Sequence, residues 1–495
     1  MKRAIISAYY KDNLEILAKE LIKHNYEIIS TGKTALYLEK KGIKTKKVEE
    51  ITNFPEILNG RVKTLHPNIH GGILAKYDDK IILEKFNIQK IDLVYVNLYP
   101  FEEMIKKINK IDDLIEFIDI GGPAMLRAAA KNYKNTLVLT DINDFDLIKE
   151  NINAVDDNTR LYLASKAFNL TAYYDSLISS YFNKILNINF PNYKSLPLKK
   201  ENKLRYGENP HQNAAYYKNT IENGFFNTIE QLNGKELSYN NYKDIDIAWK
   251  IVNEFEELTC CTLKHQTPCG VAIGKDNYDS YIKAYNCDPI SIFGGIVAFN
   301  HKVDLNTANE LNKIFLEIIV APDYDYDALE ILKKKKNLRI IKVYNPPNEK
   351  LEYSSIDGGI LVQERDLKLY NELKIVTKNK IDDELLEELI FAFKVVKYVK
   401  SNAIVVSRNK MAIGIGTGQP NRIWAAIEAL DRGKNGIVLA SDAFLPFDDV
   451  VKKAAEYNIK GIIQPGGSIR DEDSIKAANE LGIHMIFTNM RHFKH

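Results

Sequence analysis

Short apolar segments alternate with amphipathic segments along the first 150 residues. Short apolar runs predict buried strands, and apolar positions that recur with a helical period predict helices. The predicted strands are residues 4–7, 26–30, 92–97 and 136–140, and the predicted helices are residues 13–24, 34–41 and 123–132. Such alternation is typical of a parallel sheet with helices on both faces, so the first part of the chain is predicted to be an α/β domain.

A long helical pattern over residues 161–186 closes this domain. Residues 187–201 are rich in Asn, Pro and Lys and carry no hydrophobic period, which favours a boundary between domains. We therefore expect one domain over residues 1–190 and a second region over residues 200–495.

The second region continues the alternation of strands and helices. Its clearest helices each begin with an aspartate, which is a favoured N-cap residue. These helices are residues 244–255, 382–399, 449–457 and 471–481, and the clearest strands are residues 290–298, 403–406, 437–441, 462–464 and 485–488. A region of this length favours two lobes, which we expect to divide near residues 360–380. No repeat in the sequence is strong enough to indicate a duplication.

The composition is that of an ordinary enzyme, with 45% hydrophobic and 27% charged residues. Its 68 basic and 66 acidic residues give a net charge of +2, which argues against a nucleic-acid surface. No apolar run is long enough to cross a bilayer, and the first residues turn polar too soon for a signal peptide. Four cysteines without a CxxC pair indicate reduced thiols, so we expect a cytoplasmic protein.

One polar segment combines a base, a cation and a turn. It has the sequence Lys-His-Gln-Thr-Pro-Cys-Gly at residues 264–270, and it follows an apolar run that predicts a buried strand at residues 258–263. A strand that breaks at Pro-Cys-Gly would place Lys264 and His265 at a sheet edge, where ligands bind in open α/β folds. A histidine in that place is a candidate proton acceptor. The alternative is a capped loop that carries a surface histidine.

Three further histidines, His66, His70 and His211, lie in predicted loops that contain Pro or Gly. Loops on a rigid scaffold carry binding and catalysis more often than cores do. His66 and His70 are four residues apart, but Pro67 between them argues against a shared helical face and therefore against a zinc pair on a helix.

A second metal signature is also incomplete. The segment from His265 to Cys269 matches part of the zinc-deaminase pattern H-x-E…P-C-x-x-C. Thr267 stands in place of the Glu, and Ala272 stands in place of the second Cys. We therefore expect no catalytic metal.

Two glycine-containing turns follow predicted strands. Residues 30–34, Ser-Thr-Gly-Lys-Thr, precede a helix, which suits an anion at the helix N-terminus. They lack the spacing of a triphosphate-binding loop, and residues 414–419 lack the last glycine of a dinucleotide fingerprint. The sequence therefore indicates an anion at the first turn and argues against a triphosphate or a dinucleotide site.

Motifs in a fixed order extend over nearly the whole chain. They are GRVKTLHP at residues 60–67, NLYPF at 97–101, DIGG at 119–122, RAAAKN at 127–132, RYGENPHQ at 205–212, KHQTPCG at 264–270, IFGG at 292–295, KSN at 400–402, SDAF at 441–444 and RHF at 491–493. With these motifs the chain closely resembles the bifunctional family of purine biosynthesis, AICAR transformylase/IMP cyclohydrolase. The resemblance implies a methylglyoxal-synthase-like domain over residues 1–190 and two cytidine-deaminase-like lobes over residues 200–495. It also implies formyl transfer from 10-formyltetrahydrofolate to AICAR, followed by dehydrative ring closure to IMP.

For formyl transfer, the resemblance implies His265 as the base or proton shuttle, Lys264 as the cation beside it and Asn402 as an amide donor. The amine of AICAR is a weak nucleophile, because it shares its lone pair with the ring, so it must be positioned and must lose a proton as the bond forms. The implied binding positions are Arg205, Tyr206, Gly294, Glu317, Arg422, Phe444, Asp449 and Arg491. Family members are homodimers with this site at the subunit interface, so we expect a homodimer.

For ring closure, the resemblance implies active-site positions at Lys63, Tyr99, Asp119 and Lys131. Asp119 and Lys131 are assigned to the carboxamide end, and Lys63 and Tyr99 to proton transfer and oxyanion stabilisation. The implied binding positions are Lys11, Thr31, Gly32, Thr34, Arg61, Thr64 and Asn97. The alternative for Asp119 and Lys131 is an ion pair across a turn.

The chain departs from the family pattern at several positions. The first loop, usually Ser-Asp-Lys-Thr-Gly, is Tyr-Tyr-Lys-Asp-Asn at residues 9–13, and Lys33 replaces a glycine of the phosphate turn. Thr267, residues 420–421 and Leu445 also differ, so contacts with the folate are expected to change more than the reaction. Two alternatives follow: a transformylase with an impaired cyclohydrolase, or a nucleotide-binding regulatory protein without catalysis.

Overall fold

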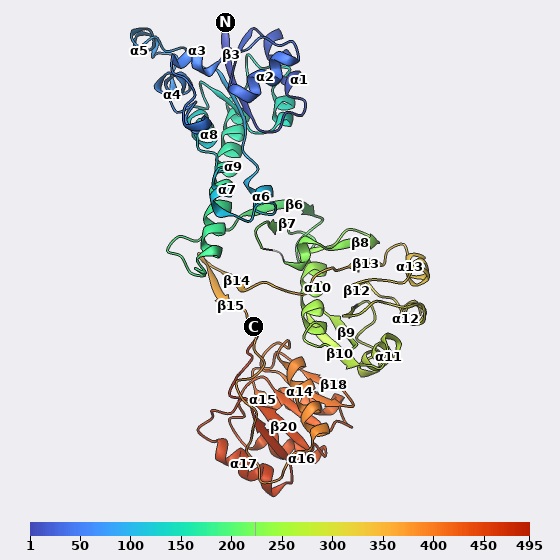
Figure 1. Cartoon of the computed structure of the whole chain (residues 1–495). Helices are drawn as coiled ribbons and strands as arrows, with labels where there is room; N and C mark the ends of the chain where they lie inside the picture. The colour runs from blue at the N-terminus through green and yellow to red at the C-terminus, as the bar shows by residue number, and fades with distance from the viewer. Residues whose placement is uncertain (223) are drawn as a thin grey trace. The chain divides into compact units, whose positions relative to one another are not determined.

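The computed structural model describes residues 1–222 and 224–495, which form two compact units (Figure 1). The first unit is Met1–Lys199 with Asn219–Ile221, and the second is Lys200–Lys218 with Glu222–His495. No helix among the described residues has the length and hydropathy that a membrane span requires.

The first unit is built on a five-stranded sheet in the order β3-β2-β1-β4-β5, in which every neighbouring pair is parallel. The strands are β1 (Lys2–Ala8), β2 (Tyr26–Ser30), β3 (Lys46–Lys47), β4 (Leu93–Asn97) and β5 (Leu137–Leu139). The predicted parallel α/β domain is therefore confirmed. Strand β3 was not predicted, because two polar residues at an edge carry no apolar signal.

The helices of this unit are α1 (Leu14–Lys23), α2 (Gly32–Lys40), α3 (Val48–Thr52), α4 (Pro67–Leu74), α5 (Lys80–Lys85), α6 (Phe101–Met104), α7 (Ile111–Ile115), α8 (Gly121–Lys131) and α9 (Asp157–Ile185). Buried side chains of the central strands pack against α1, α8 and α9 and form one core. Pro67 is the first residue of α4, where no backbone donor is needed, so it does not interrupt a helix. His66 caps this helix and His70 lies within it, so His70 is not a loop residue.

The second unit contains a mixed twelve-stranded sheet in the order β16-β21-β20-β19-β17-β18-β10-β9-β11-β12-β13-β8. On each side of its centre an antiparallel hairpin is followed by three strands that pair in parallel. The strands of one lobe are β8 (Glu230–Asn233), β9 (Thr259–Lys264), β10 (Thr267–Ile273), β11 (Ile296–Phe299), β12 (Ile318–Ala321) and β13 (Arg339–Lys342). Those of the other are β16 (Lys374–Ile375), β17 (Ile404–Arg408), β18 (Met411–Gly416), β19 (Val438–Ser441), β20 (Gly461–Gln464) and β21 (His484–Phe487).

The helices of the second unit repeat in the same order. They are α10 (Tyr239–Val252), α11 (Asn277–Cys287), α12 (Leu305–Leu311) and α13 (Tyr326–Lys333) in the first lobe, and α14 (Asp383–Val396), α15 (Arg422–Arg432), α16 (Asp449–Glu456) and α17 (Asp471–Glu480) in the second. Two separate hairpins, β6 (Leu198–Leu204) with β7 (Ala214–Asn219) and β14 (Leu351–Ile356) with β15 (Gly359–Glu364), complete the strands. The topology thus shows a duplication that the sequence alone did not indicate, because only the pattern of buried positions is shared.

Three sequence expectations in this unit were wrong. The chain turns at His265 and Gln266, and the Pro-Cys-Gly segment lies inside β10, where the pairing shifts between Pro268 and Gly270. The strand predicted from residue 290 begins only at Ile296, because the residues before it form turns around a glycine of positive φ. Of the four helices expected to begin at an aspartate cap, α14 is capped by the side chain of Asp382, whereas Ser238 caps α10. The N-cap residues of α16 and α17 are Asp448 and Arg470, and neither side chain makes a capping hydrogen bond.

Candidate functional site

A polar cradle lies where the first loop meets the start of α2. Thr34 is buried, and its hydroxyl donates to the Ala8 carbonyl at 3.0 Å and accepts from Lys11 Nζ at 3.1 Å. Burial, and then the charge of Lys33, lowers the pKa of Lys11 to about 8. Thr31 precedes Gly32, the first residue of α2. The first backbone N–H groups of this helix have no acceptor within the helix, so they are available to a ligand in the cradle. The arrangement suits the phosphate of a nucleotide.

A carboxylate and a lysine stand next to the cradle. Lys63 Nζ lies 3.2 Å from Glu56 Oε1, and both side chains are partly exposed. A Cβ on Gly32 would lie 3.3 Å from Glu56 Oε2, and a Cβ on Gly60 would lie 2.3 Å from Glu56 Oε1. The structure therefore brings Lys63 to the phosphate turn. Glu56 was missed in the sequence, because a lone glutamate in a loop carries no signal.

Asp119 sits just before α8 and faces the same place. Its Oδ1 accepts from the Gly122 N–H at 2.8 Å, and its own N–H donates to Tyr174 Oη at 2.9 Å. Burial raises its pKa above the ordinary value, although backbone donors and the charge of Lys63 oppose this rise. Thr64 is buried beside the same helix start, 2.5 Å from where a Cβ on Gly121 would lie.

Asn97, at the end of β4, fixes the altered first loop. Its Oδ1 accepts from the N–H groups of Tyr9 and Tyr10, and its Nδ2 donates to the Tyr10 carbonyl at 3.0 Å. The ring of Tyr9 meets the ring of Tyr99 edge to face, with centroids 5.7 Å apart. Tyr10 donates to Glu103, and Tyr9 and Tyr10 remain about two-fifths exposed, at 39% and 41%. Aromatic faces therefore border the polar cradle.

Two predicted residues do not join this group. Lys131 is the exposed last residue of α8, roughly 15 Å along the helix from Gly121 by the rise of 1.5 Å per residue. Among the described residues Lys131 is not one of the groups that act on the charge of Asp119, so the alternative of an ion pair across a turn finds no support. Arg61 is exposed and pairs with Glu116.

In the second unit Lys264 is the last residue of β9, and His265 is the first residue of the turn that follows. Lys264 Nζ donates to the Phe293 carbonyl at 2.7 Å, and His265 is exposed on the hairpin turn. The next residue, Gln266, donates its N–H to Asp244 Oδ1 of α10 at 2.8 Å. Asp244 was not among the predicted residues, because a carboxylate on an amphipathic helix is ordinarily a surface group.

Charged groups from neighbouring strands surround this turn. Glu317 precedes β12, accepts from Asn241 Nδ2 at 3.2 Å and lies 3.9 Å from Arg339 Nη1. Its N–H donates to the Gly295 carbonyl, next to Gly294, whose φ is +71°. Arg205 and Tyr206 also lie on this side. The Arg205 guanidinium stands 4.7 Å from the centroid of the Tyr206 ring, and its positive charge, together with burial as the main cause, lowers the pKa of Arg339.

These groups lie at the amino ends of β11, β12 and β13, since β9 runs antiparallel to β11. Lys264 and His265 therefore lie at a sheet edge, at the amino ends of the parallel strands of this lobe. In the second lobe β17 and β19 are antiparallel, so Asn402 and Asp442 do lie at the carboxyl end of β19.

Asn402 is held by a buried ion-pair network. Arg422, at the start of α15, donates to Asn402 Oδ1 at 2.6 Å, to Ser441 Oγ at 2.8 Å and to Asp442 Oδ1 at 2.5 Å. Asn402 Nδ2 donates to the Gln419 carbonyl at 2.8 Å. Because guanidinium only donates and a carbonyl only accepts, both contacts fix the same orientation of the amide. Arg422 is committed to this network, so its expected contact with a nucleotide finds no support here.

The C-terminal segment closes over the same network. Ser401 Oγ donates to Asp442 Oδ2 at 2.5 Å and accepts from the Lys494 N–H at 3.0 Å. His492 is buried, and its backbone N–H donates to the backbone carbonyl of Asp442 at 2.8 Å. The remaining predicted residues of this lobe are Arg491 and Phe444, both exposed, and Asp449, the first residue of α16.

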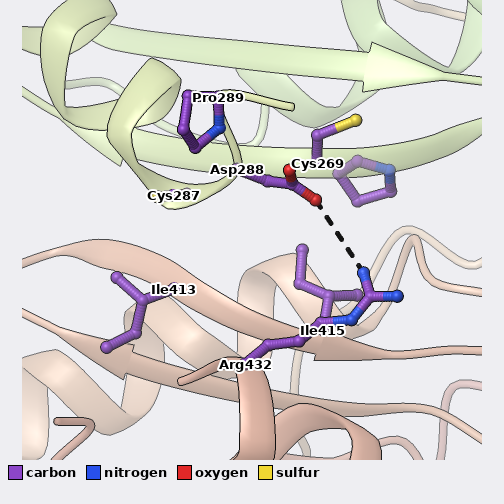
Figure 2. Close-up of a pocket in the computed structure, with 8 residues that line it drawn as sticks. Cys269, Cys287, Asp288, Pro289, Ile413, Ile415 and Arg432 are labelled. Atoms are coloured by element: carbon purple, nitrogen blue, oxygen red, sulfur yellow. Dashed lines mark ion pairs between the residues drawn. The ribbon is translucent and has the colours of Figure 1, made fainter. Parts of the chain in front are cut away.

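A pocket opens between β10 and β18 (Figure 2). It is lined by Pro268, Cys269, Cys287, Asp288, Pro289, Ile413, Ile415 and Arg432. Arg432 lies 3.9 Å from Asp288, and burial raises the pKa of Cys269 and of Cys287 to about 12. The thiols therefore stay protonated near neutral pH. None of the predicted site residues lines this pocket, so the candidate sites are the edge clusters described above.

No group of three or more His, Cys, Asp or Glu side chains in residues 1–222 and 224–495 is arranged to hold a metal ion.

Comparisons with known proteins agree with both units. A family model described as "MGS-like domain" matches residues 13–124, and one described as "AICARFT/IMPCHase bienzyme" matches residues 129–432. The "Bifunctional purine biosynthesis protein PurH" of Petrotoga mobilis is 58% identical over 506 residues, and that of Clostridium botulinum strain Hall is 58% identical over 503 residues. Each comparison covers 100% of both chains. A solved structure, "Crystal structure of ForH", is 32% identical over 37% of this chain and 98% of its own, with a TM-score of 0.33. The chain belongs to the AICARFT/IMPCHase bienzyme family.

Proposed function

We propose that the two reactions of this family are divided between the two units, with ring closure in the first and formyl transfer in the second. The chain is a bifunctional enzyme of purine biosynthesis, with AICAR transformylase and IMP cyclohydrolase activities. Its full-length similarity to proteins named bifunctional argues against the alternative of a transformylase alone. The proposed division is supported by the clustering of the predicted residues at a separate sheet edge in each unit.

For formyl transfer, we assign proton removal to His265. As the AICAR amine attacks the formyl carbon, its proton passes to the imidazole, and the departing tetrahydrofolate nitrogen receives a proton. A positioned base of this kind typically contributes about 10²–10⁴ in rate. Lys264 stands beside the base and would stabilise the developing negative charge. 10-Formyltetrahydrofolate is the proposed formyl donor.

Asn402 would donate its free amide N–H to the substrate or to the oxyanion. One N–H and the oxygen are already engaged, so the amide is oriented before substrate arrives. Asn402 and His265 share a sheet edge but are separated by the strands β9, β10, β18 and β17, or roughly 14 Å at the usual strand spacing. We therefore propose a homodimer in which a second copy completes the site.

For ring closure, the carboxamide nitrogen attacks the formyl carbon of the same molecule, and water leaves. Because this step is intramolecular, orientation and proton movement are the enzyme's main tasks. Lys11, Thr31 and Thr34 would hold the 5′-phosphate, while Lys63 and Asp119 would move protons and Tyr99 would border the base. Lys131 lies away from this group, so we assign it no contact with substrate.

The test is a direct assay of the purified protein with AICAR and 10-formyltetrahydrofolate. Formation of IMP, with formyl-AICAR as an intermediate, is the expected result. If the protein made formyl-AICAR but did not close the ring, the cyclohydrolase assignment would be wrong. If it made neither product, the proposed function as a whole would be wrong.

A further inference from the structure

The turn that carries His265 has an unfavourable backbone. His265 and Gln266 connect β9 to β10 with φ values of +52° and +61°. A two-residue hairpin turn of this kind needs positive φ at both positions, which favours Asn-Gly or Asp-Gly. Residues other than glycine are disfavoured in this left-handed region, because their Cβ crowds the following carbonyl oxygen. The sequence His-Gln therefore needs support from outside the turn.

That support comes from Asp244 on α10. Its Oδ1 accepts the Gln266 N–H at 2.8 Å, and the carboxylate also interacts with the charge of His265. Burial raises the pKa of Asp244, while the Gln266 N–H and then His265 lower it. The carboxylate is thus an anchor for the turn as well as a charge beside the imidazole.

The other charged groups near this turn have partners of their own. Lys264 Nζ donates to the Phe293 carbonyl, and Lys243 Nζ lies 2.7 Å from Glu208 Oε1. Glu317 accepts from Asn241 and faces Arg339. Within the described residues, the contact that ties the turn to the helix layer is therefore the one made by Asp244.

The duplicated lobe repeats this arrangement without a catalytic residue. There the turn between β17 and β18 is Asn409-Lys410, with φ of +55° at both positions. Its second N–H, that of Lys410, donates to Glu388 Oε2 at 2.8 Å, and Ser407 Oγ donates to Glu388 Oε1 at 2.6 Å. Asp244 and Glu388 hold the same place, five positions after the first residue of α10 and of α14. The fold therefore uses a helix carboxylate to hold each hairpin turn.

We propose that Asp244 is a positioning residue for formyl transfer, which holds the His265 turn in the geometry that proton removal requires. This inference depends on the proposed role of His265 as the base. Asp244 does not touch the reacting atoms; it acts through the backbone of Gln266 and the orientation of the imidazole.

The test compares Asp244→Ala with Asp244→Asn in the full-length protein. The Asn oxygen can still accept the Gln266 N–H, whereas Ala leaves this donor without its partner. For Asp244→Ala we expect kcat of formyl transfer to fall about 10²-fold, the effect of a small misplacement of a catalytic group, with KM for AICAR within about twofold. Asp244→Asn should recover most of that loss, and cyclisation of formyl-AICAR should be unchanged in both variants.

Glu388→Ala is the matched control, because it removes the same contact from a turn that carries no base. It should leave kcat of formyl transfer within about threefold of the wild-type value, well short of the loss expected for a misplaced base. The proposal is overturned if Asp244→Ala keeps full kcat, if Glu388→Ala loses as much, or if the loss is in KM. If instead the proposed role of His265 as the base were wrong, the His265→Ala variant would retain formyl transfer, and this result distinguishes the two failures.

Discussion

Two arginines of α15 allow a direct comparison of a buried ion pair with an exposed one. Arg422 begins the helix and pairs with Asp442, which is fully buried. Arg432 ends the helix, is 56% exposed and lies 3.1 Å from Glu428. The perturbation is substitution of each arginine by methionine, which keeps helix propensity and much of the side-chain volume.

The magnitudes follow from burial. Removing one partner of a buried pair costs about 3–5 kcal/mol, because a charge is left unpaired in the interior. Asp442 keeps the donors Ser401 Oγ and the Ala403 N–H, so we expect the lower end, about 3 kcal/mol, for Arg422→Met. The exposed pair of Arg432 is worth about 0–1 kcal/mol. The two variants should therefore differ by about 2 kcal/mol or more.

Tryptophan fluorescence during urea unfolding is a suitable assay, because both tryptophans, Trp249 and Trp424, lie in the second unit. With a slope of about 3 kcal/mol per molar urea, Arg422→Met should lower the midpoint by about 1 M and Arg432→Met by at most about 0.3 M. The Arg422 variant should also lose kcat of formyl transfer, since Asn402 is released. Equal urea midpoints for the two variants, together with a raised KM for AICAR in Arg422→Met, would refute this reasoning and would indicate that Arg422 binds the nucleotide.

Two further predictions concern the first unit. Because the pKa of Lys11 is lowered to about 8, its ammonium is lost between pH 7 and 9, so binding of IMP should weaken up to about tenfold over this range. Calorimetric titration should show that step in the wild type and not in Lys11→Met; equal affinity at both pH values would contradict a phosphate contact. A methyl group on Gly60, where φ is +87°, would lie 2.3 Å from Glu56 Oε1 and 3.1 Å from Lys63 Nζ. Gly60→Ala should therefore slow cyclisation at least about tenfold and leave formyl transfer unchanged, and an unaltered cyclisation rate would show that Lys63 is not needed in this position.

The parallel sheet of the first unit could be predicted from the sequence, because its strands are continuous apolar runs. Strands β1, β2 and β4 correspond to the predicted segments. The duplicated topology of the second unit could not be predicted, since matched burial positions are filled by different residues. The apolar residues after Pro289 predicted a strand but lie in turns, where buried Ile292 packs beside residues of the core.

The sequence and the family resemblance provide candidate site residues, but they do not indicate which residues support them. Asp244 and Glu56 are ordinary acidic residues in the sequence, and only the fold brings them to His265 and Lys63. The resemblance implied a nucleotide contact for Arg422, whereas in the structure its guanidinium binds buried Asp442; a guanidinium suits a phosphate and a buried carboxylate alike. Partners from distant segments are set by tertiary structure rather than by spacing.

The division of the two reactions between two sites can be tested with one pair of variants. His265→Ala and Lys63→Ala are assayed separately and mixed, each with AICAR and 10-formyltetrahydrofolate, and IMP is followed by chromatography. We predict that the Lys63 variant accumulates formyl-AICAR, that the His265 variant makes no product from AICAR, and that their mixture makes IMP. Loss of both steps in either folded variant, or a mixture that yields no IMP, would contradict two separate sites.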